Sequence, residues 1–239
     1  MEFVPASAPS VAAFPVIVAA VIVALLWAAH RTWHSAQATF IAALVLAVWL
    51  GAQAALVASA RLTSLPLNGL PFFFGPILLI WTGLALSPVG GKIAASMPFT
   101  ALVAFQAFRL PLELVLHSWA AQGTIPATMT WTGQSWDILS GLVALVCAPF
   151  ASRRRGAAWL ANVVGFALLM NVVRVAIMSS PVPFGWHTQP LLLLAFHLPY
   201  ALIGPVCVGG ALFGHLVLTR ALLSRPTAAQ RELGPPSKP

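Results

Sequence analysis

Charged side chains, and acidic ones above all, are scarce in this sequence. Only 7% of the 239 residues are Asp, Glu, Lys or Arg, and only four of these are acidic. A soluble domain carries about 25% charged residues, so this composition excludes a water-soluble globular protein. Apolar residues make up 60% of the chain. We therefore predict an integral membrane protein whose main partner is the lipid bilayer.

Cysteine and histidine are also few, and neither is arranged as a metal site. Cys147 and Cys207 lie in different apolar segments, which favours small buried hydrophobic side chains over a disulfide or a ligand set. His30 and His34 have the spacing of two zinc ligands on a helix but lack the Glu of a zinc-protease motif. We predict no metal and no cofactor, and place these two histidines and His215 at the cytoplasmic boundary of the membrane.

Long apolar runs are what the sequence does contain. A transmembrane helix needs about 20 mostly apolar residues to cross about 30 Å of hydrocarbon. The segments that meet or approach this length are 11–29, 38–58, 70–87, 95–117, 137–150, 157–178 and 190–219. The sequence therefore predicts an all-α bundle of about seven transmembrane helices.

Two features of these segments refine the organisation. The segment 190–219 is too long for one straight crossing, and Pro199 and Pro205 should bend it, leaving 190–199 partly interfacial. We predict a single membrane domain over 1–224, followed by a disordered cytoplasmic tail over 225–239.

Basic residues give the predicted orientation. Three arginines at 153–155 separate the fifth and sixth segments, and loops rich in Lys and Arg stay in the cytoplasm. The connections 118–136 and 179–189 contain no Lys or Arg, as expected for the outer side. This arrangement puts the N-terminus outside and the C-terminus inside. The net charge of +8 is explained by this asymmetry, so we predict no nucleic-acid partner.

Only two acidic residues, Glu113 and Asp137, lie inside the hydrophobic body of the chain. Arg109, Glu113 and His117 are spaced four apart and share one helical face. A charge at the bilayer centre costs about 2.5–3.5 kcal/mol, so such residues usually face the protein interior and pair. We expect Arg109 to pair with Glu113 and Arg174 to pair with Asp137, with Asp137 at the outer boundary.

Topology predicts that further polar residues reach the same outward level from other helices. We predict an outward-facing polar pocket formed by Arg109, Glu113, His117, Asp137, Asn171, Arg174 and His197. The alternative is that these residues serve chiefly to hold the helices together.

The order of several short motifs resembles the exosortase/archaeosortase family of membrane transpeptidases over about residues 110–204. The matching features are Pro-Leu-Glu-Leu at 111–114, Gly-Thr-Ile-Pro at 123–126, Leu-Ser-Gly-Leu at 139–142, Asn-Val-Val-Arg at 171–174 and His197. The resemblance implies a multi-pass protein of the bacterial plasma (inner) membrane.

The position of the family's nucleophilic cysteine is occupied by Leu139. An isobutyl group cannot attack a carbonyl carbon as a thiolate does, and Cys147 lies two helical turns deeper. We therefore expect an exosortase-like protein without peptidase activity, which binds a membrane-delivered peptide, lipid or saccharide of the cell envelope. A small transporter or proton-coupled subunit, and an assembly protein of an envelope export system, are the alternatives.

Overall fold

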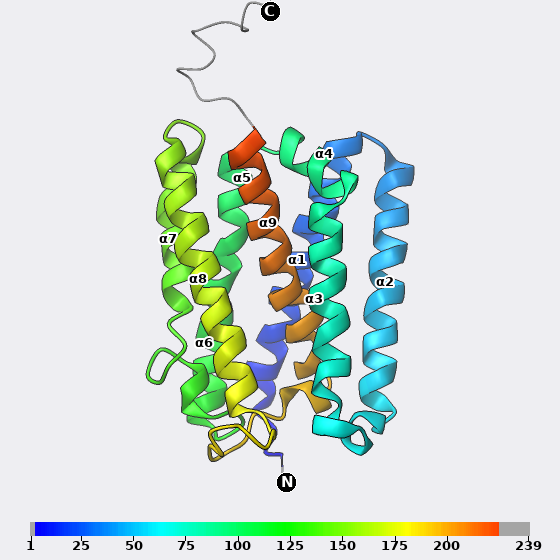
Figure 1. The fold of residues 1–239 in the computed structure, drawn as a ribbon, viewed down its shortest axis with the longest axis vertical. Helices are drawn as coiled ribbons and strands as arrows, with labels where there is room; N and C mark the ends of the chain where they lie inside the picture. Colours follow the sequence, from blue (N-terminus) through cyan, green and yellow to red (C-terminus); the bar gives the residue numbers. More distant parts are fainter. Residues whose placement is uncertain (1–2, 225–239) are drawn as a thin grey trace, which may run out of the picture.

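Six helical segments in the computed structural model are long and apolar enough to cross a membrane, and a seventh apolar helix is shorter (Figure 1). The structure describes residues 3–224, and no strand occurs among them. The helical membrane bundle predicted from the sequence is therefore confirmed. The predicted tail at 225–239 lies outside the described residues.

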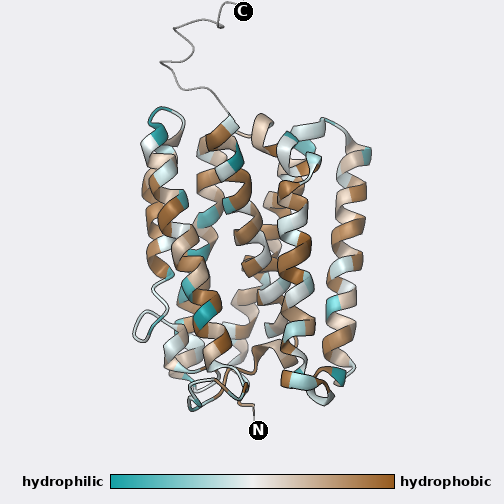
Figure 2. Cartoon of the chain, in the orientation of Figure 1, coloured by the Kyte–Doolittle hydropathy of each residue, from teal (hydrophilic) through white to brown (hydrophobic). Residues whose placement is uncertain are grey.

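In the first half of the chain, long helices are joined by short helical turns (Figure 1). These elements are α1 (Ala8–Trp33), α2 (Ala36–Ala58), η1 (Arg61–Ser64), η2 (Pro66–Gly69), α3 (Leu70–Leu86) and α4 (Pro88–Ser96). The helix with two prolines, α3, is continuous despite Pro76. Helix α2 lies at the edge of the bundle and packs mainly on α1, so most of its surface is apolar and exposed (Figure 2).

The second half forms the remaining segments. They are α5 (Phe99–Ala104), η3 (Phe105–Phe108), α6 (Arg109–Ala121), η4 (Ala127–Met129), α7 (Ile138–Ala151), α8 (Arg155–Ser179), η5 (Leu194–Phe196), η6 (Tyr200–Ile203), η7 (Gly204–Val208) and α9 (Gly209–Ser224). Elements α5, η3 and α6 form one crossing. Its 3₁₀ turn precedes Pro111, whose missing N–H leaves the carbonyl of Ala107 without its helical partner.

The last crossing is the central one. Of its apolar 18-residue stretch, 78% is buried, against at most 44% of the corresponding stretch in the other five long segments. It starts at Tyr200, directly after Pro199, so residues 190–199 lie outside this helical segment, and their predicted interfacial position stays a prediction. At Gly209 the absence of a side chain lets the Trp81 ring of α3 pack directly against the last crossing. A Cβ atom there would lie 2.1 Å from Nε1 of Trp81. That indole instead donates to the carbonyl of Pro205 at 2.8 Å.

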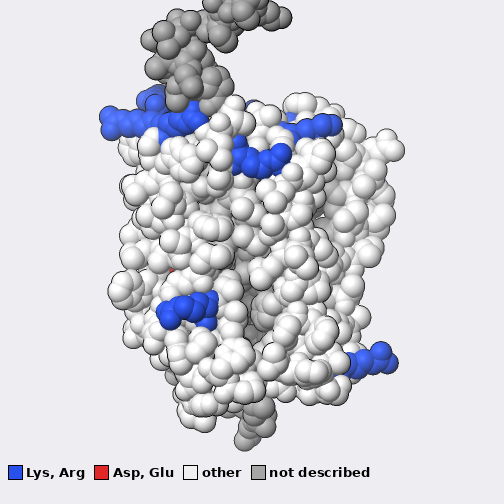
Figure 3. Space-filling model, viewed as in Figure 1, with Lys and Arg blue, Asp and Glu red and all other residues white. Residues whose placement is uncertain are grey.

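Basic side chains gather at the end of the bundle where α9 finishes (Figure 3). We call it the basic end, and it holds Arg31, Lys92, Arg153, Arg154, Arg155 and Arg220. Two of these arginines join neighbouring helices there. Arg155 of α8 donates to the carbonyl of Leu222 in α9, and Arg220 of α9 donates to the carbonyls of Ala85 and Ser87 at the end of α3.

Helix α7 corrects one expectation about depth. It has only 14 residues, a length of about 21 Å, and in Figure 1 it begins well short of the end of the bundle where the N-terminus lies. Asp137, which precedes it, is therefore inside the protein and 5% exposed, rather than at the outer boundary. The loop before α7 runs along the rest of the length of the bundle. It is held against α8, where Asn171 donates a hydrogen bond to the backbone carbonyl of Gln134 at 2.7 Å.

Candidate functional site

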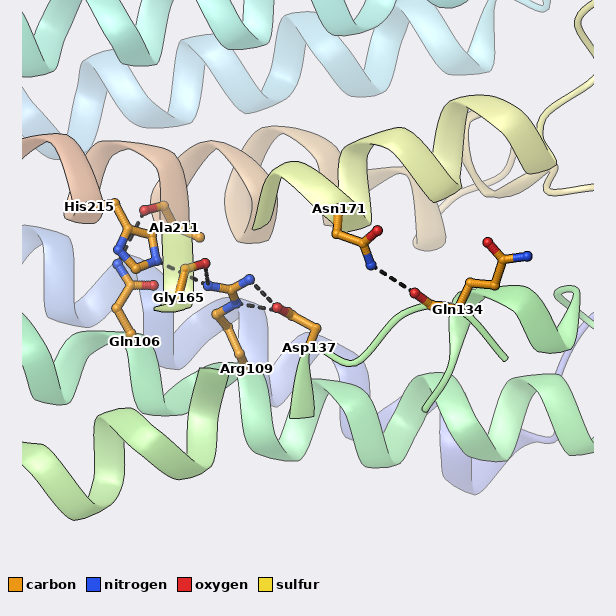
Figure 4. Close-up of polar contacts among 8 residues, drawn as sticks. All are labelled: Gln106, Arg109, Gln134, Asp137, Gly165, Asn171, Ala211 and His215. Atoms are coloured by element: carbon orange, nitrogen blue, oxygen red, sulfur yellow. Dashed lines mark hydrogen bonds and ion pairs between the residues drawn. The ribbon is translucent and has the colours of Figure 1, made fainter. Parts of the chain in front are cut away.

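A buried ion pair joins α6 to the start of α7. Arg109 is 1% exposed, and its Nε donates to Oδ2 of Asp137 at 2.7 Å while Nη2 donates to Oδ1 (Figure 4). A two-pronged contact of this kind is the strongest geometry available to Arg and a carboxylate. The predicted pairs Arg109–Glu113 and Arg174–Asp137 are wrong. Arg109 pairs with Asp137 instead, and both carboxylate oxygens of Asp137 accept hydrogen bonds from that guanidinium.

The second terminal nitrogen of Arg109 extends this contact to α8 and α9. Nη1 donates to the carbonyl of Gly165 at 2.8 Å and lies 3.0 Å from Nε2 of His215. Guanidinium only donates hydrogen bonds, so Nε2 must be the accepting nitrogen. The proton of the neutral ring then sits on Nδ1, which lies 3.0 Å from Oδ1 of Asn162. Asn162 in turn donates to Thr219 at 2.7 Å.

The burial of His215 corrects the prediction that it is interfacial. The side chain is 0% exposed and lies between α6, α8 and α9. Sequence reasoning missed His215, Asn162 and Thr219 because each stands alone in an apolar run. The available signal was their spacing. His215 and Thr219 are four residues apart and share one face of α9, and Asn162 and Gly165 are three residues apart and share one face of α8.

Glu113 is the other buried acid, and one of its carboxylate oxygens has no partner. It is 1% exposed, and its Oε2 atom has no hydrogen-bond partner in the described structure. A buried acceptor without a partner costs about 1–3 kcal/mol, more for a charged group. Such a group in a native protein requires a reason, and a ligand or bound water is a common one.

Glu113 lies in the wall of a cavity of about 70 Å³ between α3, α6, α8 and the segment 192–211. Arg109, Asp137 and Ser180 are the other polar lining residues. The apolar lining residues are Phe73, Phe74, Phe108, Leu112, Leu116, Met129, Leu169, Val172, Ala176, Leu192, Leu194, Ala195, Ala201, Ile203, Cys207, Val208 and Ala211. The surface is hollowed between α3 and α8 in the half away from the basic end (Figure 3).

Three of the seven predicted pocket residues, Arg109, Glu113 and Asp137, thus line one cavity. The cavity is mainly apolar rather than polar. The other four do not line it. The ring of His117 stacks on Trp131 with centroids 4.1 Å apart, and His197 stacks on Phe3 at 3.9 Å.

Asn171 and Arg174 lie in the half of α8 away from the basic end and support the surrounding loops. Asn171 accepts hydrogen bonds from Nε and Nη2 of Arg174 at 3.3 and 2.9 Å, and it donates to Gln134. The Arg174 guanidinium also lies 5.5 Å from the centre of the Trp186 ring. Because Arg174 is exposed, it does not face Asp137.

Leu139 and Ser140, the residues compared above with the position of a transpeptidase nucleophile, show no activated nucleophile in the described structure. Leu139 is 44% exposed on the outside of α7. Ser140 is buried near His215, since a Cβ atom on Gly165 would lie 2.9 Å from its hydroxyl and 3.0 Å from Nε2. However, that nitrogen already accepts from Arg109, so it cannot take a proton from Ser140 in this arrangement.

Comparisons with other proteins add no family. Within the described residues, no three His, Cys, Asp or Glu side chains are grouped as a metal site. No protein-family model matches the chain, and no curated protein or solved structure shows significant similarity to it.

Proposed function

We propose that this multi-pass membrane protein binds the end of an amphipathic molecule in the cavity beside Glu113 and catalyses no peptide cleavage. In this proposal the chain crosses the bacterial inner membrane seven times, with the basic end in the cytoplasm. The cavity then lies in the outer half of the membrane, where a lipid or an exported peptide is delivered. The arrangement of motifs that resembles the exosortases supports this placement.

The unpartnered Oε2 atom of Glu113 carries the proposal. The neighbouring Arg109 and Asp137 satisfy each other, so Glu113 is the group left to recognise a ligand. Its missing partner is a hydrogen-bond donor, such as an ammonium or hydroxyl group. The 17 apolar lining residues favour an alkyl chain or an apolar peptide end over a saccharide, which needs many polar partners.

The size of the cavity limits what enters it. At about 70 Å³ it is smaller than an engineered cavity of about 150 Å³ that holds benzene. A narrow chain end fits this space, whereas a whole drug-sized ligand requires about 300–1,000 Å³.

Three probes of equal chain length test this proposal: dodecylamine, dodecanol and dodecane. We expect the amine and alcohol to raise the unfolding temperature of the purified protein more than dodecane does. Glu113→Leu should remove this preference while the protein stays folded. Leu114→Ala is the matched control, because Leu114 is the next residue but is 55% exposed on the outside of α6. Equal responses of folded parent and Glu113→Leu protein to all three probes would overturn the proposal.

Orientation is tested by thiol labelling of intact cells. Thr132 lies in the loop between α6 and α7, and Gln37 lies at the start of α2, and both are exposed. We expect Thr132→Cys, but not Gln37→Cys, to react with an impermeant maleimide. The native Cys147 and Cys207 are buried, so their background reaction is low. The opposite labelling pattern would reverse the proposed topology.

A structural or assembly role is the second candidate, and the contacts of Arg109 favour it. That side chain holds α7, α8 and α9 against α6. The same contacts disfavour proton coupling through this layer, because an arginine stays protonated and does not pass protons on.

A further inference from the structure

A second cavity lies on the opposite half of the bundle, near the basic end. It has a volume of about 350 Å³ and lies between α1, α4, α5 and α9. Its lining includes Ala24 and Trp27 from α1, Ile93 from α4, Ala101 from α5 and Gly214 from α9. Every lining residue is apolar or glycine, so the part of any occupant that enters must be apolar too.

The volume selects among apolar occupants. A single turn of an α-helix, about 10 Å wide and 5.4 Å high, takes up about 400 Å³, so no partner helix fits inside. The space lies within the range of about 300–1,000 Å³ typical of small-molecule sites. A flexible alkyl chain is therefore the occupant that the shape admits.

Two cations lie on helices that line this cavity, toward the basic end. Arg31 follows Trp27 by four residues, so it lies one turn closer to the basic end on the same face of α1. Lys92 precedes the lining residue Ile93 on α4. The two helices are tied together there, because Thr32 and Ser96 are hydrogen-bonded at 2.9 Å.

The charges of Arg31 and Lys92 are not neutralised within the protein. Both side chains are exposed, and neither has an ion-pair partner among residues 3–224. The carboxylates of that part of the chain are Glu113 and Asp137, and both are buried on other elements. An anion beside Arg31 and Lys92 thus meets two free cations and no competing acidic side chain.

We infer that this cavity binds one acyl chain of an anionic phospholipid whose phosphate lies between Arg31 and Lys92. When the acyl chain of such a lipid occupies the apolar cavity, its phosphate lies at the membrane surface, where Arg31 and Lys92 are. Each basic residue near the surface contributes about 1 kcal/mol to the binding of anionic lipid, which is roughly fivefold in affinity.

Trp27 provides a direct readout, because it lines the cavity and is 48% exposed. The full-length protein is reconstituted in vesicles that contain phosphatidylglycerol or phosphatidylcholine with brominated acyl chains, which quench tryptophan fluorescence on contact. The signal of Trp27 is the difference between the parent and Trp27→Phe. We expect this difference to saturate at a lower fraction of brominated phosphatidylglycerol than of brominated phosphatidylcholine.

Charge variants decide the outcome. Arg31→Ala and Lys92→Ala should each weaken the phosphatidylglycerol preference roughly fivefold, and the double variant roughly 25-fold. Arg61→Ala is the matched control, because Arg61 is an exposed arginine at the other end of the bundle. The inference fails if the two lipids quench Trp27 equally in the parent, or if the double variant keeps the parent's preference. Neither readout depends on Glu113, so the outcome is separate from that of the proposed function.

Discussion

Arg109 and His215, which are 106 residues apart in the sequence, meet in the middle of the bundle with Nη1 and Nε2 3.0 Å apart. The contact holds a guanidinium against the unprotonated nitrogen of a neutral imidazole. It also fixes which face of α9 is turned toward α6.

His215→Ala should destabilise the protein by about 2–6 kcal/mol. The substitution leaves a donor of Arg109 and the acceptor of Asn162 without partners, and each such buried group costs about 1–3 kcal/mol. Denaturant unfolding of the detergent-solubilised protein measures the loss. His34→Ala, just past the end of α1, should change stability by less than about 0.5 kcal/mol. Equal effects of the two variants would contradict the buried network.

Gly165→Ala should be destabilising by about 1–3 kcal/mol, because the added methyl group would lie 2.6 Å from Cε1 of His215. Gly156, on the same helix, has open space where a methyl group would stand, with no atom within 4 Å, so Gly156→Ala is the matched control. We expect Gly156→Ala to be neutral or slightly stabilising, since alanine favours helix. Thermal unfolding of both variants checks the difference.

Breaking the buried ion pair from one side should cost about 3–5 kcal/mol. Arg109→Leu and Asp137→Leu each strand the remaining charge in the protein interior. The double variant should lose less stability than the sum of the two single variants, and a double-mutant cycle measures this coupling. Arg174→Leu, at an exposed position of α8, should cost less than about 1 kcal/mol. Additive effects of Arg109→Leu and Asp137→Leu would show that the pair is not coupled.

His197 should make the stability of the protein depend on pH. Burial lowers the pKa of His197 below its usual value of about 6.5, so the unfolded chain binds the proton more readily than the folded one. This contribution is present above about pH 6.5 and is lost as the pH falls through the lower pKa of the folded state. His197→Gln should therefore show a smaller loss of stability than the parent between pH 7 and pH 5. Thermal unfolding of both proteins at pH 7 and pH 5 measures the difference, and equal losses would contradict the prediction.

The membrane helices were predictable because hydropathy summed over about 20 residues is a strong local signal. The starts of α2 and α3 fall within two residues of the predicted boundaries. The site was only partly predictable, since pairing depends on which helices meet. Arg109 and Glu113 share a helix face, yet the fork of Arg109 is filled by Asp137 from another helix. No local pattern shows that contact.

The depth of Asp137 was not predictable for a related reason. The polar loop before it has the composition of a solvent-exposed connection, but it enters the bundle where α8 supplies a partner for its backbone. Irregular backbone at this depth is tolerated only where the protein satisfies it. The sequence does not show that Asn171 does so.

The short α7 also affects the surrounding lipid. Its outward side chains, among them Leu142, Leu145 and Val146, give the lipid an apolar wall only about 21 Å tall, against about 30 Å of hydrocarbon in an ordinary bilayer. Trp136, which is 57% exposed, marks the limit of that wall at the start of the helix. We expect this hydrophobic mismatch to thin the membrane along this side and to favour neighbouring lipids with short tails, whereas α1 and α2, with 26 and 23 residues, should cause no such deformation.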